Sequence, residues 1–121
     1  MLSNDELKNK IFYLYKNKIS LMKPKGGEFY ISNIKFITIN RQKVEGFQYS
    51  GTNKYVPFET LFKCYEQLYK TGFLTRIWFR TDFPFEHLTR PCNFTTIGSI
   101  FVKLGFAEYV NDGKYKKWNC L

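Results

Sequence analysis

Small polar side chains are spaced along residues 93–104, outside the apolar positions of that stretch. The apolar residues recur at intervals of three and four, which is typical of a helix with one buried face. They are Ile97, Ile100, Phe101 and Leu104. The polar residues off that face are Asn93, Thr95, Thr96, Ser99 and Lys103. Short hydroxyl and amide groups with a cation can reach base edges and phosphates, so the stretch indicates a nucleic-acid surface. A solvated helix face is the alternative.

A second basic group follows the tripeptide Asn111-Asp112-Gly113, which is a strong signal for a tight β-hairpin turn. This group is Lys114, Lys116 and Lys117. Cations on such a hairpin can neutralise phosphates, and the counterions that are then released favour binding at low salt. Lysines also protect exposed edge strands from aggregation, which is the alternative role for the group.

No arrangement of residues predicts catalysis. Asp82, Glu86 and His87 are close in sequence, but a single histidine beside acids on a short helix is usually a surface or hydrogen-bonded residue. Cys92 follows His87 across a proline turn, and no oxyanion site accompanies the pair. The 10 acidic residues are scattered, without the carboxylate cluster that a metal-dependent nuclease needs. We therefore expect no enzyme activity and no cofactor.

The cysteine pattern and the absence of long apolar runs predict a cytoplasmic protein. Cys64, Cys92 and Cys120 are far apart and odd in number, which fits a reducing compartment better than a disulfide framework. With a single histidine and no Cys-x-x-Cys pair, no structural zinc site is expected. The N-terminal residues show no signal-peptide pattern, and no apolar run has the length of a membrane span.

The chain carries a large excess of positive charge. Lys and Arg number 19 against 10 acids, a formal charge of +9. Residues 1–57 hold ten basic and four acidic side chains, and residues 58–121 hold nine and six. Such an excess on a small protein attracts polyanions such as nucleic acid. A solvated cationic surface that reflects a biased genome composition is the alternative.

The first half, residues 1–57, predicts one helix and a small antiparallel sheet. Ser3 and Glu6 have the spacing of a capping box at the start of a helix that extends to about Ile19. Residues 23–27 form a basic, glycine-containing loop. Residues 29–39, 44–49 and 54–56 are predicted strands separated by polar turns.

The second half, residues 58–121, predicts mainly helices and a final hairpin. Apolar residues from Phe58 to Tyr69 show the clearest helical period, and Gly72 is a natural C-cap. Residues 74–79 favour a strand, and a short helix with Pro84 in its first turn runs to about Leu88. Asn93 or Thr95 can cap the next helix, to residue 104, and strands follow at 106–110 and 114–118. Within this helix Gly98 permits close approach of a DNA backbone or of another helix.

We expect a single α+β domain over residues 1–121, with an N-terminal helix and small antiparallel sheet followed by a winged-helix-like half. The element order from Phe58 is that of a winged helix, whose third helix enters the major groove and whose hairpin approaches the backbone. The runs 90–98 and 104–109 also resemble helix-turn-helix segments of small bacterial and phage DNA-binding domains, including some linked to restriction-modification systems. This resemblance implies that the polar side chains of the helix face DNA and that the hairpin lysines and Arg90 contact phosphate.

The expected function is non-catalytic binding of double-stranded DNA by a regulator or targeting module. The helix 94–104 would contact the major groove of the DNA, and cationic side chains, including Lys103, would contact the DNA phosphates. Two alternatives stay open. One is a protein-interaction module, such as a phage-type inhibitor of a host defence nuclease, and the other is RNA binding through the basic first half.

Overall fold

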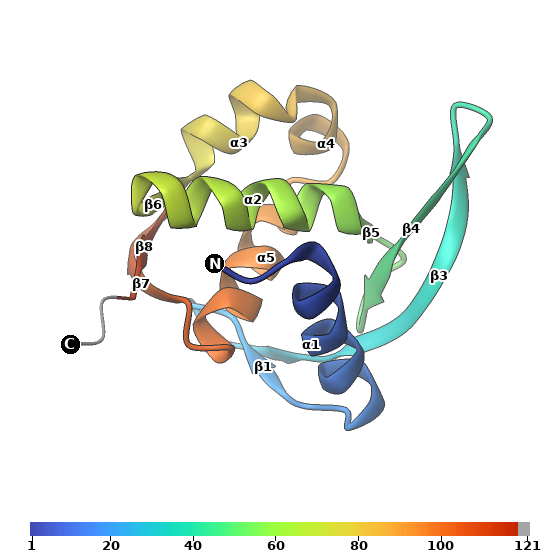
Figure 1. Ribbon diagram of the computed structural model, residues 1–121, viewed down its shortest axis with the longest axis horizontal. Helices are drawn as coiled ribbons and strands as arrows, with labels where there is room; N and C mark the ends of the chain where they lie inside the picture. The colour runs from blue at the N-terminus through green and yellow to red at the C-terminus, as the bar shows by residue number, and fades with distance from the viewer. Residues whose placement is uncertain (119–121) are drawn as a thin grey trace.

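The computed structural model describes residues 1–118 and has an α+β architecture (Figure 1). Its helices are α1 (Asn4–Lys16), α2 (Phe58–Thr71), α3 (Arg76–Asp82), α4 (Pro84–Thr89) and α5 (Cys92–Lys103). Its strands are β1 (Leu21–Met22), β2 (Glu28–Phe29), β3 (Ile31–Ile39), β4 (Gln42–Tyr49), β5 (Tyr55–Pro57), β6 (Phe73–Thr75), β7 (Ala107–Asn111) and β8 (Lys114–Lys117). The predicted α+β class, with an N-terminal helix followed by a small sheet, is confirmed.

The N-terminal elements follow the local sequence signals closely. Ser3 and Glu6 make the expected capping box, in which each side chain accepts a hydrogen bond of 3.1 Å from the other residue's backbone N–H. α1 ends at Lys16, earlier than predicted, and Lys18 adopts a left-handed φ of 47°. Strands β3, β4 and β5 form the predicted antiparallel meander, and the β3–β4 hairpin projects beyond the helices (Figure 1). The short β1–β2 hairpin was not predicted.

The C-terminal sheet is built from strands that are distant in sequence. β8 lies between β6 and β7, and both pairings are antiparallel. The predicted strand at residues 74–79 is wrong beyond Thr75, because the Thr75 hydroxyl accepts a hydrogen bond of 3.1 Å from the Trp78 N–H and starts α3 there. Phe79, one of the aromatic residues that favoured a strand, is instead fully buried on one side of this helix.

A buried hydrogen-bond network holds α5 against four other elements. The Asn93 amide donates to Glu86 Oε1 at 2.7 Å and to the Tyr55 carbonyl at 2.9 Å, and its oxygen accepts from the Tyr49 hydroxyl at 3.0 Å. The Thr60 hydroxyl donates to Glu86 Oε2 at 2.9 Å. The prediction that Asn93 could cap α5 is therefore wrong, because its side chain is used inside the core. The helix begins at Cys92 without a side-chain cap.

Gly98 allows an aromatic ring of the hairpin to pack directly on α5. A Cβ atom at this position would lie 2.1 Å from the Tyr115 ring, and that ring is almost fully buried. Phe94 packs on the same ring, with the centroids 5.6 Å apart. The absence of a side chain at Gly98 therefore serves the contact between α5 and β8, and neither a second helix nor a DNA backbone is needed to explain it.

We expect the substitution Gly98→Ala to destabilise the protein by about 1–3 kcal/mol, because the Tyr115 ring must move within a close-packed core. Urea unfolding measures the change. The double variant Gly98→Ala/Tyr115→Leu makes room for the new methyl group, so its loss should be smaller than the sum of the two single losses. Strictly additive losses would contradict this packing contact.

We expect the substitution Glu86→Gln to alter the pH dependence of stability. Burial raises the pKa of the Glu86 carboxyl above its usual value, while the hydrogen bonds from Asn93 and Thr60 act in the opposite direction. The folded chain therefore binds this proton more strongly than the unfolded chain, and the free energy of unfolding rises as pH falls through the raised pKa. Gln keeps the shape of the side chain but removes this contribution.

The measurement is urea unfolding of both proteins from neutral pH to about pH 4, near the usual pKa of glutamate. The stability of the Gln variant relative to the original chain should be highest at neutral pH and should decline as the solution is acidified. A difference that stays constant across this range would show that Glu86 does not titrate between these limits.

Candidate nucleic-acid interface

The helix expected to enter the major groove is the central helix of the structure. Eight of the twelve residues of α5 are buried. β1 packs against it, and Ser20, Met22 and Glu28 lie beside Ser99 and Lys103 around one surface cavity. Residues 23–26 lie beside the N-terminal part of the same helix. Residues 20–28, which we call the N-terminal segment, thus cover the side of α5 that a groove-binding helix would expose.

Asn93, Thr96 and Ser99 are therefore corrected as nucleic-acid contacts. Their exposed fractions are 0%, 1% and 2%. Asn93 is saturated by the buried network, and the Ser99 hydroxyl donates to the Thr95 carbonyl at 2.8 Å. Small polar side chains suit the buried part of such a helix because they are compact and their hydrogen bonds are satisfied inside the protein. In this conformation they cannot reach a base edge.

Three further predicted contacts lie in separate places. Thr95 is half-buried and accepts a hydrogen bond of 3.2 Å from the Arg76 guanidinium. Lys103 is exposed at the opposite end of α5, beside Glu28. Arg90 is half-buried, its Nε has no hydrogen-bond partner in the described part of the chain, and its charge acts on the pKa of Glu86. Only Thr95 of these three lines a cavity that also holds several cations.

The hairpin lysines do not form one cluster. Lys114 and Lys116 lie on one side of β8, where the Lys114 ammonium lies 4.5 Å from the centre of the Phe73 ring. Lys117 is directed to the other side, and its ammonium lies 3.7 Å from the centre of the Tyr69 ring. The hairpin therefore presents Lys114 and Lys116 together, while Lys117 packs on α2.

Two adjoining cavities flank the turn between β7 and β8, and together we call them the basic groove. Their volumes are about 260 and 400 Å³, and both are lined by Arg76, Asp112 and Gly113. The cations along the groove are Lys23, Lys25, Arg76, Arg80 and Lys114. Asp112 is the one acidic side chain among the residues that line either cavity. Three other surface cavities, beside Ser99, Trp118 and Trp78, are each lined by only one or two cations.

Arg76 is held at the centre of the groove by neutral partners. Its guanidinium donates to the Pro91 carbonyl and to the Thr95 hydroxyl, both at 3.2 Å, and lies 4.7 Å from the centre of the Phe94 ring. Its backbone N–H donates to the Gly113 carbonyl at 2.9 Å, which ties the start of α3 to the hairpin turn. Within residues 1–118 the guanidinium makes no ion pair, although its charge helps to lower the pKa of the Asp112 carboxyl in the same groove.

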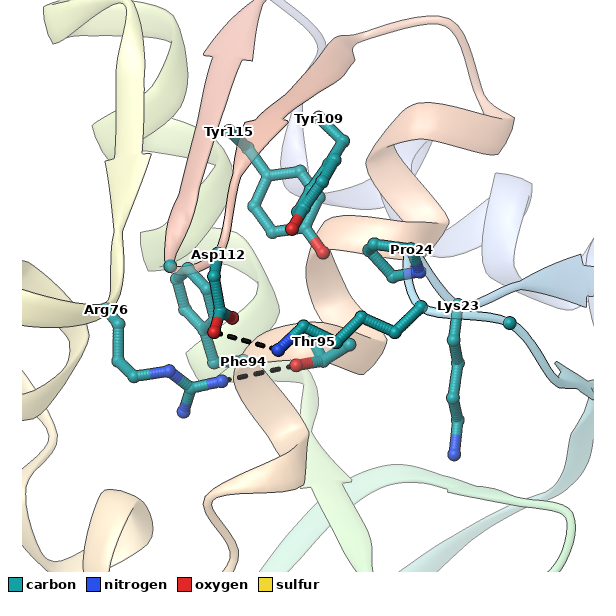
Figure 2. A pocket seen from close by; sticks show the side chains of 11 residues that line it. Lys23, Pro24, Arg76, Phe94, Thr95, Tyr109, Asp112 and Tyr115 are labelled. Atoms are coloured by element: carbon teal, nitrogen blue, oxygen red, sulfur yellow. Dashed lines mark hydrogen bonds and ion pairs between the residues drawn. The ribbon is translucent and has the colours of Figure 1, made fainter.

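Lys25 crosses the groove and pairs with Asp112 at 2.9 Å (Figure 2). The pair raises the pKa of the Lys25 ammonium and lowers the pKa of the Asp112 carboxyl, mainly through their hydrogen bond. Both side chains are exposed, so the pair adds little stability and can be exchanged for a ligand. The Lys23 ammonium is directed away from this pair, toward the Phe29 ring at 5.8 Å (Figure 2).

Sequence reasoning missed the groove because its parts are far apart in the chain. Lys23 and Lys25 were assigned only to a flexible basic loop, and Arg76 to a predicted strand. Their shared position depends on the packing of β1 on α5 and on the pairing of β6 with β8. The charge of the 23–27 loop was a usable signal, but no local pattern indicates which element the loop covers.

Cys64 is buried, and burial raises the pKa of its thiol, while Cys92 is exposed and Cys120 lies outside the described residues. Within residues 1–118, no group of three or more His, Cys, Asp or Glu side chains is arranged to hold a metal ion. None of the helices in that range combines the length and apolar character needed to cross a membrane.

Comparisons of the chain with protein-family models, with curated proteins and with solved structures found no match.

Proposed function

We propose that this protein binds double-stranded DNA without catalysis, and that it contacts the phosphate backbone through the basic groove. The observation that carries the proposal is the gathering of Lys25, Arg76, Arg80 and Lys114 around two adjoining cavities with a single carboxylate. Lys23 adds charge at the rim. Phosphate contacts of this kind supply most of the affinity of sequence-independent binding.

The charges of the groove favour an external polyanion over internal neutralisation. Within residues 1–118, Arg76, Arg80 and Lys114 make no ion pair. By contrast, Lys63 and Lys70 on α2 are each paired with a glutamate one turn away. Arginine also presents a planar fork that matches phosphate oxygens, and two of the groove cations are arginines.

The order of elements supports a duplex as the ligand. From α2 onward the chain runs helix, strand, helices, hairpin, and the sheet order is β6-β8-β7. This order resembles that of a winged helix, in which the hairpin approaches the DNA backbone, and we take the resemblance as support for a duplex ligand. Insertion of α5 into the major groove is not part of the proposal, because the N-terminal segment covers that helix. Specificity for a base sequence is therefore not proposed either.

A protein partner is the second candidate, and one observation favours it. Ile77, Phe85 and Leu88 on α3 and α4 are 69%, 67% and 79% exposed, which is unusual for large apolar side chains. If a protein partner binds this apolar surface, Phe85→Ser/Leu88→Ser should abolish binding to that partner while duplex binding by the basic groove is retained.

We expect Arg80→Ala/Lys114→Ala to weaken duplex binding and its salt dependence. Two lost phosphate contacts should reduce the slope of log K against log salt by about 1.8, at about 0.9 per contact. Fluorescence anisotropy with a labelled random-sequence duplex, titrated across salt concentrations, gives both quantities. Urea unfolding of the variant checks the fold, because Lys114 also packs over Phe73.

The matched control is Lys63→Ala/Lys70→Ala, which removes the same charge from α2, where both lysines already have acidic partners. It should leave the salt slope almost unchanged. Equal losses in both variants would show that only net charge matters and would overturn the groove as the site. Tighter binding to double-stranded RNA than to DNA would move the proposal to the alternative nucleic acid.

A further inference from the structure

The cavity of about 260 Å³ in the basic groove combines cations with aromatic walls (Figure 2). Residues 23–26 form one side, and α5 and the β7–β8 hairpin form the others. Pockets for drug-sized molecules are usually larger, so this cavity suits a small ligand, part of which can extend into the open groove. We call it the loop cavity.

The loop cavity offers two cations that an anion can bridge. Two N–H groups of the Arg76 guanidinium are used by Pro91 and Thr95, and its remaining donors are free for a ligand. Lys25 lines the same cavity, and within residues 1–118 its ammonium makes one ion pair, with the exposed Asp112 carboxylate. A phosphate monoester carries up to two charges and three acceptor oxygens, so it can bind both cations at once.

An aromatic wall stands beside these cations. Tyr109 lines the loop cavity and is 39% exposed, and its ring is fixed edge to face against Tyr115 with centroids 5.6 Å apart. Burial raises the pKa of Tyr115 to about 12, so the ring against which Tyr109 packs stays neutral at physiological pH. Pro24 also lines the cavity, next to Lys25 (Figure 2). A rigid exposed ring of this kind is a stacking surface for a planar base.

We propose that the loop cavity binds one nucleoside monophosphate unit, with its phosphate between Arg76 and Lys25 and its base against Tyr109. The inference rests on the proposed function, because it names a subsite of the same groove. On a nucleic acid the unit is an unpaired, phosphorylated strand end. A free mononucleotide presents the same chemistry. In either case the phosphate displaces Asp112 from Lys25, and Asp112 opposes binding by charge repulsion.

The first test is titration of the full chain with AMP, adenosine and inorganic phosphate, followed by NMR of backbone amides. AMP should bind more tightly than either fragment and should shift the amide signals of Gly26 and Gly113, which line the cavity. Tyr109→Ser should weaken AMP binding about tenfold, toward the affinity of inorganic phosphate. The control Tyr13→Ser, at an exposed position on α1, should bind AMP as the original chain does.

A second variant acts in the opposite direction. Asp112→Asn removes the repulsive carboxylate and frees Lys25, so AMP should bind several-fold more tightly. A general loss of structure cannot produce a gain, so this result supports the site even if Tyr109→Ser proves unstable. Weaker or unchanged AMP binding by Asp112→Asn would overturn the proposed position of the phosphate.

The source of the unit is resolved with oligonucleotides that carry a 5′-phosphate or a 5′-hydroxyl on a short single-stranded overhang. A preference for the phosphorylated end assigns the site to strand ends, and AMP binding without that preference assigns it to free nucleotide. If a blunt duplex binds but AMP does not shift Gly26 and Gly113, the inference fails and the proposed function stands. If AMP binds and no duplex does, the inference holds for free nucleotide and the proposed function fails.

Discussion

The Asn93 amide determines what α5 can do. Three hydrogen bonds join it to Tyr49, Tyr55 and Glu86, and Thr60 completes the network through Glu86. These residues come from β4, β5, α4, α5 and α2. A buried carboxylate and a buried amide are costly without partners, so any movement of α5 that separates them would expose each to an unfavourable environment. This network therefore holds α5 in a fixed position inside the protein.

Because α5 is internal, the cations of the proposed interface lie around the hairpin turn and not on a free face of the helix. The N-terminal segment lies over the helix and brings Lys25 within 2.9 Å of Asp112. Arg76 reaches the same place from the start of α3, and Phe94 and Thr95 hold it from α5. One helix therefore stabilises the fold with its buried side chains and positions a cation with the few that reach the surface.

Local signals in the sequence were sufficient for most elements and insufficient for the site. The capping box at Ser3, the helical period from Phe58 and the turn at residues 111–113 each depend on neighbours a few residues away. Each of these elements formed, although α1 ends earlier than predicted. Thr96 and Ser99 looked like an exposed face because periodicity identifies only the first buried side of a helix. That a second side is covered depends on β1, far earlier in the chain. Of the predicted contacts, Thr95 and Lys114 line the groove.

The position of β1 has a consequence for the order in which the protein is made. Leu21 and Phe29 are buried in the finished protein, and β1 packs on a helix that begins more than half a chain length later. During translation the first half therefore leaves the ribosome with apolar side chains that have no complete partner surface. β1 can complete its packing only after α5 has been synthesised, because this contact joins residues that are distant in the chain.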